Sequence, residues 1–179
     1  MESIKELKIE FIKLYDQHHA GIYRFIRFKV PTLDIAQDLA AETYTRAWDY
    51  LSRNLDKYPK NPRAYLYKTA RNLVADHYKS AKVRREFNVE EDEVLEYLDK
   101  GENSDIEDNL DIRTNMKLVQ KCLQDMDSQN AELITLRYIE EFSNTEIAQI
   151  TGKTEVAVRV GISRGLKELR EKMEKQDSS

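Results

Sequence analysis

Basic side chains recur at helical spacing in two stretches of this sequence, and their chemistry suits contact with nucleic acid. In one stretch, near the end of the chain, three basic residues share a face of a predicted helix with two valines and a serine. This face consists of Val156, Arg159, Val160, Ser163, Arg164 and Lys167. The other set follows helical spacing in the first half, where Arg84 and Arg85 continue the charge: Lys68, Arg71, Asn72, Lys79 and Lys82. Lysine and arginine bind phosphates and guanine edges, and exposed valines could touch thymine methyl groups. The two sets predict two nucleic-acid contacts, unless their charges are merely solvated.

Three tyrosines accompany the second basic set. Tyr65, Tyr67 and Tyr78 interleave with its lysines and arginines along the predicted helix. Basic side chains beside aromatic rings suit a single strand, because unpaired bases stack on such rings. The alternative is a solvated charged face above tyrosines that belong to the core. The spacing alone leaves both interpretations open.

A third set of residues has mixed charge. Asp38, Glu42 and Arg46 are spaced four residues apart and therefore share one stripe of a predicted helix. Such a stripe can be a ladder of intrahelical ion pairs, each worth only a few tenths of a kcal/mol. It can equally be a surface that binds a partner protein, and the spacing does not decide between the two.

Catalysis finds little support in the residue pattern. The three histidines (His18, His19 and His77) and the single cysteine, Cys122, have no metal-ligand spacing, and no glycine-rich phosphate loop is present. We therefore expect no catalytic residue, no metal and no cofactor. A lone cysteine cannot form an internal disulfide and suits a reducing cytoplasm. No apolar run approaches about 18 residues, so we expect no membrane insertion.

Helical periodicity runs through most of the chain, and no stretch alternates apolar and polar residues as a strand would. In the first half it predicts helices over residues 4–28, about 34–51 and 62–85, with a loop over 53–61. Asp34 and Gln37 predict a capping box at the second helix, and Pro62 suits the first turn of the third. In the second half it predicts helices over residues 116–126 and 128–141.

Residues 144–173 fit a helix-turn-helix. Ser143 or Asn144 is expected to cap a short helix, and Gly152 permits the left-handed backbone that ends it. Thr154 is placed to cap the next helix. Five apolar residues of that helix are expected to face inward: Val158, Ile162, Leu166, Leu169 and Met173. A helix with a core face and a partly basic face can enter a major groove; the alternative is an ordinary corner in a helical bundle.

Charge is distributed unevenly, although the formal net charge of the 179 residues is only −4. Residues 86–111 hold twelve acidic side chains and one lysine, a net charge of −11, and the rest of the chain carries +7. Self-repulsion and few large apolar residues predict an extended connector there. We expect an all-α protein with a three-helix domain over residues 1–86, an acidic linker over 87–111 and a four-helix domain with the helix-turn-helix over 112–175.

The order of these motifs resembles that of a bacterial extracytoplasmic-function (ECF) sigma factor. Four blocks carry the resemblance: LYDQHHAGIYRFI, DIAQDLAAETYTRAW, NPRAYLYKTARNLVADHYKSAKVRR and, after the acidic segment, LRYIEEFSNTEIAQITGKTEVAVRVGISRGLKELRE. They cover nearly the whole chain outside the linker and the ends. Each block alone is a modest signal, whereas four in this order are specific.

The resemblance implies a subunit that directs core RNA polymerase to promoter DNA and initiates transcription without catalysis of its own. The stripe of Asp38, Glu42 and Arg46 would bind the clamp of the beta-prime subunit, and the beta flap would be a second contact. The −10 element would be read as a melted single strand by the loop and the third helix: Lys57, Tyr58, Lys60, Asn61, Arg63, Lys68, Arg71, Asn72 and Lys79. An unstacked base would enter a pocket formed by that loop, and Asn72 would line it.

The −35 element would be read as duplex by the helix-turn-helix, through Thr154, Val156, Ala157, Arg159, Val160, Ser163, Arg164 and Lys167. The resemblance also implies an acidic linker that runs through the polymerase, and an anti-sigma factor that occludes both domains. Ala41 stands where glutamine is common in the family. Ala157, Val160 and Gly161 stand where threonine, serine and a basic residue are frequent. With fewer long donors, we expect a −35 preference that depends on phosphate contacts and DNA shape.

Two other hypotheses remain. The first is a free-standing helix-turn-helix transcriptional regulator, which usually needs a dimer to span two half-sites; we find no obvious dimerisation helix after Met173. The second is a helical interaction protein with no role on DNA. Salt-dependent DNA binding by the C-terminal half would exclude the second, and initiation with core polymerase would exclude the first.

Overall fold

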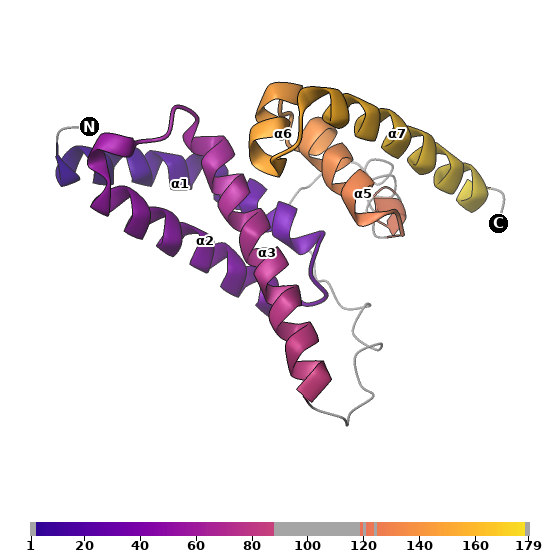
Figure 1. The fold of residues 1–179 in the computed structure, drawn as a ribbon, viewed down its shortest axis with the longest axis horizontal. Helices are drawn as coiled ribbons and strands as arrows, with labels where there is room; N and C mark the ends of the chain where they lie inside the picture. Colours follow the sequence, from indigo (N-terminus) through magenta and orange to yellow (C-terminus); the bar gives the residue numbers. More distant parts are fainter. Residues whose placement is uncertain (1–2, 88–118, 120, 124, 178–179) are drawn as a thin grey trace, which may run out of the picture. The chain divides into compact units, whose positions relative to one another are not determined.

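The structure is a computed structural model that describes residues 3–87, 119, 121–123 and 125–177 (Figure 1). These residues form helices and turns, and no strand occurs among them, which confirms the predicted all-α class. The chain divides into two compact units, Met1–Gly101 and Glu102–Ser179. The predicted acidic linker lies outside the described residues except for Phe87, and so does Met116 of the helix predicted next.

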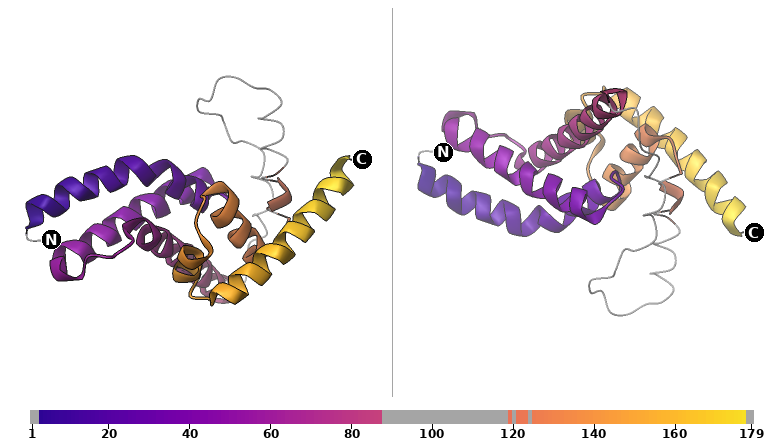
Figure 2. Two further views of the ribbon diagram at one scale, coloured as in Figure 1. Left: turned by 90° about the horizontal axis from the view of Figure 1, so that it is seen from above. Right: turned by 90° about the horizontal axis from the view of Figure 1, so that it is seen from below.

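The first unit is built from three long helices. They are α1 (Ile4–Arg27), α2 (Leu33–Arg53) and α3 (Pro62–Phe87), with a short 3-10 helix, η1 (Leu55–Lys57), between the last two. Each long helix packs against the other two, and α1 and α2 lie side by side (Figure 2). The bounds agree with the predicted helices to within about two residues at each end.

Apolar side chains at the predicted helical spacing make the core of this unit. The ring of Phe25 on α1 meets that of Tyr67 on α3 edge to face, with 5.4 Å between centroids. Phe11 meets Trp48 of α2 in the same way at 5.3 Å. Around them lie fully buried aliphatic residues: Leu7, Ile22, Ile26, Ala36, Ala47, Leu51, Leu66 and Ala70. Each large one stabilises the unit by about 1.5–3 kcal/mol.

Side-chain caps set where the helices of this unit begin. Thr32 Oγ1 accepts a hydrogen bond from Ile35 N at 3.3 Å and so caps α2. The predicted capping box of Asp34 and Gln37 is therefore wrong, because the helix starts earlier and Asp34 lies within its first turn. Asn61 Oδ1 accepts from Ala64 N at 3.0 Å and caps α3, with Pro62 at the first helical position as predicted.

The second unit contains α5 (Ser128–Ile134), α6 (Asn144–Thr151) and α7 (Glu155–Asp177), and both shorter helices pack on α7. Residues 119 and 121–123 are helical as well. The helix predicted over 128–141 does not stay an α-helix: it widens into a π-helix, η2 (Thr135–Ile139), where Glu140 N donates to Thr135 O, five residues back, at 2.9 Å. The core holds Leu133, Leu136, Phe142, Ile147, Ile150 and Val158.

Candidate functional sites

The helix-turn-helix of the second unit has caps at each of its predicted breaks. Ser143 Oγ accepts from Glu146 N at 3.2 Å, and the Glu146 carboxylate accepts from Ser143 N at 2.9 Å, so a capping box begins α6. Gly152 ends α6 in the left-handed region, with φ of 72°. Thr154 Oγ1 then accepts from Ala157 N at 3.2 Å at the start of α7. The predicted motif is confirmed.

The outer face of α7 is available to a ligand. All eight residues predicted to contact the −35 element are exposed: Thr154, Val156, Ala157, Arg159, Val160, Ser163, Arg164 and Lys167. Val158 and Ile162 are buried on the opposite face as predicted. Leu166 was expected to face inward, and this is wrong, because its side chain is 38 % exposed. The buried position of that turn belongs to Gly165.

Two glycines let α7 approach α5 closely. A Cβ added at Gly161 would lie 2.3 Å from Leu133 Cδ1, and one at Gly165 would lie 2.8 Å from Ile134 Cγ1. Gly161 therefore belongs to the contact with α5, and its lack of a side chain is explained by packing. Sequence reasoning missed this role. The signal was two glycines four residues apart inside a predicted helix. Each destabilises the helix by about 1 kcal/mol relative to alanine, so their presence indicates a requirement of packing.

Glu168 ties α7 to the start of α5. Its Oε1 accepts from Asp127 N at 3.0 Å, and its Oε2 accepts from Asn130 Nδ2 at 2.9 Å. Asp127 in turn caps α5, since its Oδ1 accepts from Gln129 N and Asn130 N. Together with the glycine contact, this carboxylate fixes the direction in which α7 presents its outer face.

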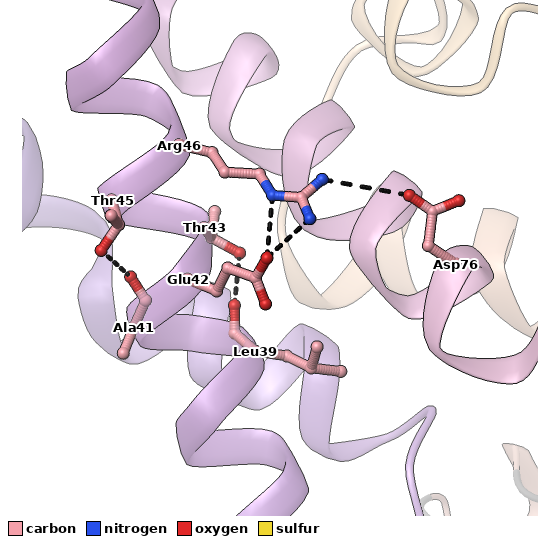
Figure 3. Close-up of polar contacts among 7 residues, drawn as sticks. All are labelled: Leu39, Ala41, Glu42, Thr43, Thr45, Arg46 and Asp76. Atoms are coloured by element: carbon pink, nitrogen blue, oxygen red, sulfur yellow. Dashed lines mark hydrogen bonds and ion pairs between the residues drawn. The ribbon is translucent and has the colours of Figure 1, made fainter. Parts of the chain in front are cut away.

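The mixed-charge stripe lies on α2 and includes an intrahelical ion pair (Figure 3). Glu42 Oε1 is 2.6 Å from one terminal nitrogen of Arg46 and accepts from Arg46 Nε at 2.9 Å. Arg46 Nη1 also lies 4.0 Å from Asp76 Oδ2 on α3. Asp38, one turn earlier, is exposed. The ion-pair interpretation thus holds for Glu42 and Arg46, but exposed pairs of this kind contribute little to stability.

The loop before α3 borders a pocket of about 270 Å³ on the first unit. The predicted −10 residues Tyr58, Asn61 and Arg63 line it, together with Lys13 and His18 from α1. Burial, and secondarily the carboxylate of Glu10, raises the pKa of the Tyr58 phenol, so this group stays a neutral hydroxyl. The pocket thus combines hydrogen-bond donors with one carboxylate, that of Glu10, which pairs with Lys13 at 2.9 Å.

The remaining predicted −10 residues lie outside this pocket. Lys57 and Lys60 of the loop and Lys68, Asn72 and Lys79 of α3 are exposed, whereas Arg71 is half-buried. Asn72 was expected to line the pocket of the loop, but it is not among the residues that line the pocket beside Tyr58. The exposed side chains on α3 can therefore contact DNA, but the structure does not gather them into one cavity.

The three tyrosines of α3 have different surroundings. Tyr67 is buried against Phe25, so it belongs to the core and cannot stack on a base. The Tyr78 hydroxyl donates to the carbonyl of Lys29, which anchors that ring to the end of α1. Tyr65 is half-buried and lies beside Tyr50, with 5.6 Å between centroids. Only Tyr67 is thus lost from the predicted stacking surface, since Tyr78 is 48 % exposed and Tyr65 is half-buried.

The cysteine and His18 are at least partly buried. Cys122 is buried, as predicted for an apolar role. Burial, and then the nearby Arg63 guanidinium, lowers the pKa of His18 below 6.5, which keeps its imidazole neutral at pH 7. Within the described ranges, no group of three or more histidine, cysteine or acidic side chains could hold a metal ion. No helix in the described part of the chain is long and apolar enough to cross a membrane.

Comparison with known proteins matches both units to one family. Residues 14–84 match the family model of Sigma-70 region 2, and residues 116–169 match that of Sigma-70, region 4. Together these matches cover more than half of the chain. The chain belongs to the sigma-70 family of RNA polymerase sigma factors, in its ECF branch.

Two curated relatives show how far the similarity extends. The chain is 34 % identical over 152 residues to the ECF RNA polymerase sigma factor BldN of Streptomyces coelicolor, covering 83 % of this chain but only 54 % of that longer protein. It is 25 % identical to the RNA polymerase sigma factor SigV of Bacillus subtilis over 179 residues, the whole of both chains. The sigma factor RpoE of Bartonella quintana, solved with the anti-sigma factor NepR, has a similar fold, with a TM-score of 0.65, 19 % identity, and coverage of 92 % of this chain and 97 % of that one.

Proposed function

We propose that this chain directs core RNA polymerase to promoters, with its two units reading two separate DNA elements. The observation that carries the proposal is the outer face of α7, which is exposed, partly basic and held by a capped helix-turn-helix inside the region 4 match. A helix of this kind fits a major groove. The chain acts as an initiation factor while the polymerase performs the chemistry, and it therefore works where the polymerase is, in the cytoplasm.

The first unit is proposed to hold the −10 element as a single strand. The exposed Lys57, Lys60, Lys68 and Lys79 supply sequence-independent contacts with phosphates. The pocket beside Tyr58 and Asn61 supplies hydrogen-bond donors for an unstacked base, and its volume of about 270 Å³ has room for one. Unstacking costs a few kcal/mol, so a base that fits the pocket is selected over one that does not.

The test of this proposal is transcription in vitro with purified core polymerase. Promoters are first located by mapping transcription starts after overexpression of the chain. Core enzyme plus the chain should then initiate at those promoters, and core enzyme alone should not. A helix-turn-helix regulator would bind the same DNA without supporting initiation by core enzyme. The proposal is refuted if the reconstituted enzyme initiates at none of the mapped promoters.

The α2 stripe is proposed to bind the polymerase clamp. The double variant Glu42→Arg with Arg46→Glu keeps an intrahelical ion pair but reverses the charges that a partner meets. It also places a carboxylate beside Asp76, but repulsion between exposed groups costs little. The variant should therefore unfold at only a slightly lower denaturant concentration than the wild type, yet bind core polymerase about ten-fold more weakly or worse, a loss of about 1.4 kcal/mol. Binding at the wild-type level would mean that the stripe is only an ion-pair ladder.

An anti-sigma factor is the proposed regulator, as in the Bartonella structure, in which RpoE is bound to NepR. Two cores joined by a long acidic segment could be clamped by one inhibitor that covers both DNA-reading faces. Small-angle scattering of the free protein tests this idea. Lengthening the segment over residues 87–111 should increase the radius of gyration; one fixed compact shape that does not respond to lengthening would count against it.

A further inference from the structure

The centre of the outer face of α7 is apolar where a recognition helix approaches the bases. At 3.6 residues per turn, Val156, Val160, Ser163 and Lys167 fall on one line along the helix. This line lies opposite the buried Val158 and Gly165. Val156 is 61 % exposed and Val160 is 45 % exposed, which is unusual for valine and leaves four methyl groups in contact with water. The first half of the line therefore carries no hydrogen-bonding side chain.

The cations of the same face lie to the sides of that line. Arg159 is displaced about 70° to one side and Arg164 about 70° to the other, by helix geometry. Both are exposed, and Lys167 lies further along the helix. When the line enters a groove, side chains displaced in this way reach the two phosphate strands more readily than the groove floor. In this arrangement the arginines contact the DNA phosphates, and the residues on the line contact the bases.

We infer that Val156 and Val160 read the 5-methyl groups of thymines in the −35 element. Among the groups displayed on the floor of the major groove, the thymine methyl is the apolar one, and valine can exclude water from it. The inference rests on the proposed function, because it requires α7 to lie in the −35 duplex. It sharpens the expected preference: phosphate contacts give affinity, and methyl contacts give specificity.

The spacing of the two valines limits which thymines they can reach. Four residues span about 6 Å along an α-helix, and successive bases of one strand are about 3.4 Å apart along the duplex. The two methyl groups should thus lie about two base-pair steps apart. Because both valines are exposed, replacing them removes groups that the core of the unit does not use.

Deoxyuridine, which is thymidine without the methyl group, provides the test. Promoter fragments carry deoxyuridine at one thymine of the mapped −35 element at a time, and initiation by the reconstituted holoenzyme is measured on each. Loss of one buried methyl should lower initiation about four-fold, the equivalent of about 0.8 kcal/mol. We expect this decrease in initiation at two thymines of the element. Val156→Ala should abolish it at one of the two thymines, and Val160→Ala should abolish it at the other.

Arg159→Ala is the matched control on the same face. It should weaken initiation on all fragments and reduce the salt dependence, while the thymine-to-deoxyuridine ratio stays as in the wild type. Equal initiation on every fragment, or a ratio that persists in both valine variants, overturns the inference and leaves the proposed function intact. Absence of initiation even on thymine-containing fragments refutes the proposed function and the inference with it.

Discussion

His18 lies half-buried on α1, where burial and Arg63 lower its pKa below the ordinary value of 6.5. In the unfolded chain the imidazole takes up a proton near pH 6.5, whereas in the folded unit it stays neutral to a lower pH. The unfolded state therefore binds more protons in that window, and the free energy of unfolding falls as the pH drops below about 6.5.

We expect His18→Gln to flatten this part of the pH profile of the first unit. Urea unfolding of the wild type and the variant, measured at steps between pH 7.5 and pH 5.5, gives the two slopes. At pH 7.5 the histidine is neutral in both the folded and the unfolded state. The change in unfolding free energy of each protein is therefore measured relative to its value at pH 7.5. Identical slopes for both proteins would show that His18 does not contribute to the acid sensitivity.

Glu141 has a strained backbone in the turn before α6. Its φ is 55°, in the left-handed region, and it is the one residue other than glycine with positive φ in the described part of the chain. A side chain in that region costs about 1–2 kcal/mol, which glycine avoids. Glu141→Gly should raise the free energy of unfolding of the second unit by roughly 1 kcal/mol in urea unfolding, and Glu141→Ala should not. A destabilised glycine variant would contradict this account of the turn.

At the scale of elements, the contact between α5 and α7 depends on Gly165. A Cβ there would lie 2.8 Å from Ile134 Cγ1 and 3.3 Å from the backbone oxygen of Asn130, neither of which can move freely. Alanine normally gains about 1 kcal/mol over glycine in a helix, but overpacking a core costs about 1–3 kcal/mol.

Taking a mid-range overpacking cost of about 2 kcal/mol and the alanine gain of about 1 kcal/mol, we expect Gly165→Ala to lower the free energy of unfolding of the second unit by about 1 kcal/mol in urea unfolding. Ser163→Ala is the comparison, because that residue is exposed on the same helix and has no neighbour to clash with. It should leave stability unchanged or slightly higher. A Gly165→Ala variant as stable as the wild type would show that α7 can shift away from α5 without loss.

The helices and the helix-turn-helix were predictable from sequence because their signals are local. The 3.6-residue period, Pro62, Gly152 and Thr154 each act within one turn of the backbone they control. The π-helix was not predictable in this way, since it spans only five residues, too few to show a period of their own. The exposure of Leu166 was missed because the glycine beside it takes the buried position, which only the packing against α5 reveals.

Helical phase predicted which candidate residues of α7 are exposed, but it could not predict how the residues of the first unit are arranged. The predicted residues of α7 are all exposed, as their helical phase requires. On the first unit, helical phase could not separate Tyr67, which packs on Phe25, from Tyr65, which stays half-buried. Nor could it show that a pocket beside the loop takes its other wall from α1, because that contact joins residues distant in sequence.

At the scale of the whole molecule, charge is the property that links the two units. Residues 86–111 carry −11, whereas the rest of the chain carries +7, with exposed cations on α3 and α7. A polyanionic segment attached to two basic surfaces competes with DNA for them at low ionic strength. This competition would suppress non-specific DNA binding by the free protein, since such binding depends almost entirely on phosphate contacts.

We predict that neutralising six of the twelve acidic residues, by Glu→Gln and Asp→Asn changes, raises non-specific affinity for duplex DNA several-fold at about 50 mM salt. The gain should disappear toward 1 M salt, where the Debye length is only about 3 Å. Fluorescence anisotropy with a duplex lacking promoter elements measures both. A segment with the same residues in permuted order is the control and should behave like the wild type, because the effect depends on net charge. If the neutralised variant binds no better than the wild type at low salt, the acidic segment does not compete with DNA, and its charge must serve a contact made only within the polymerase.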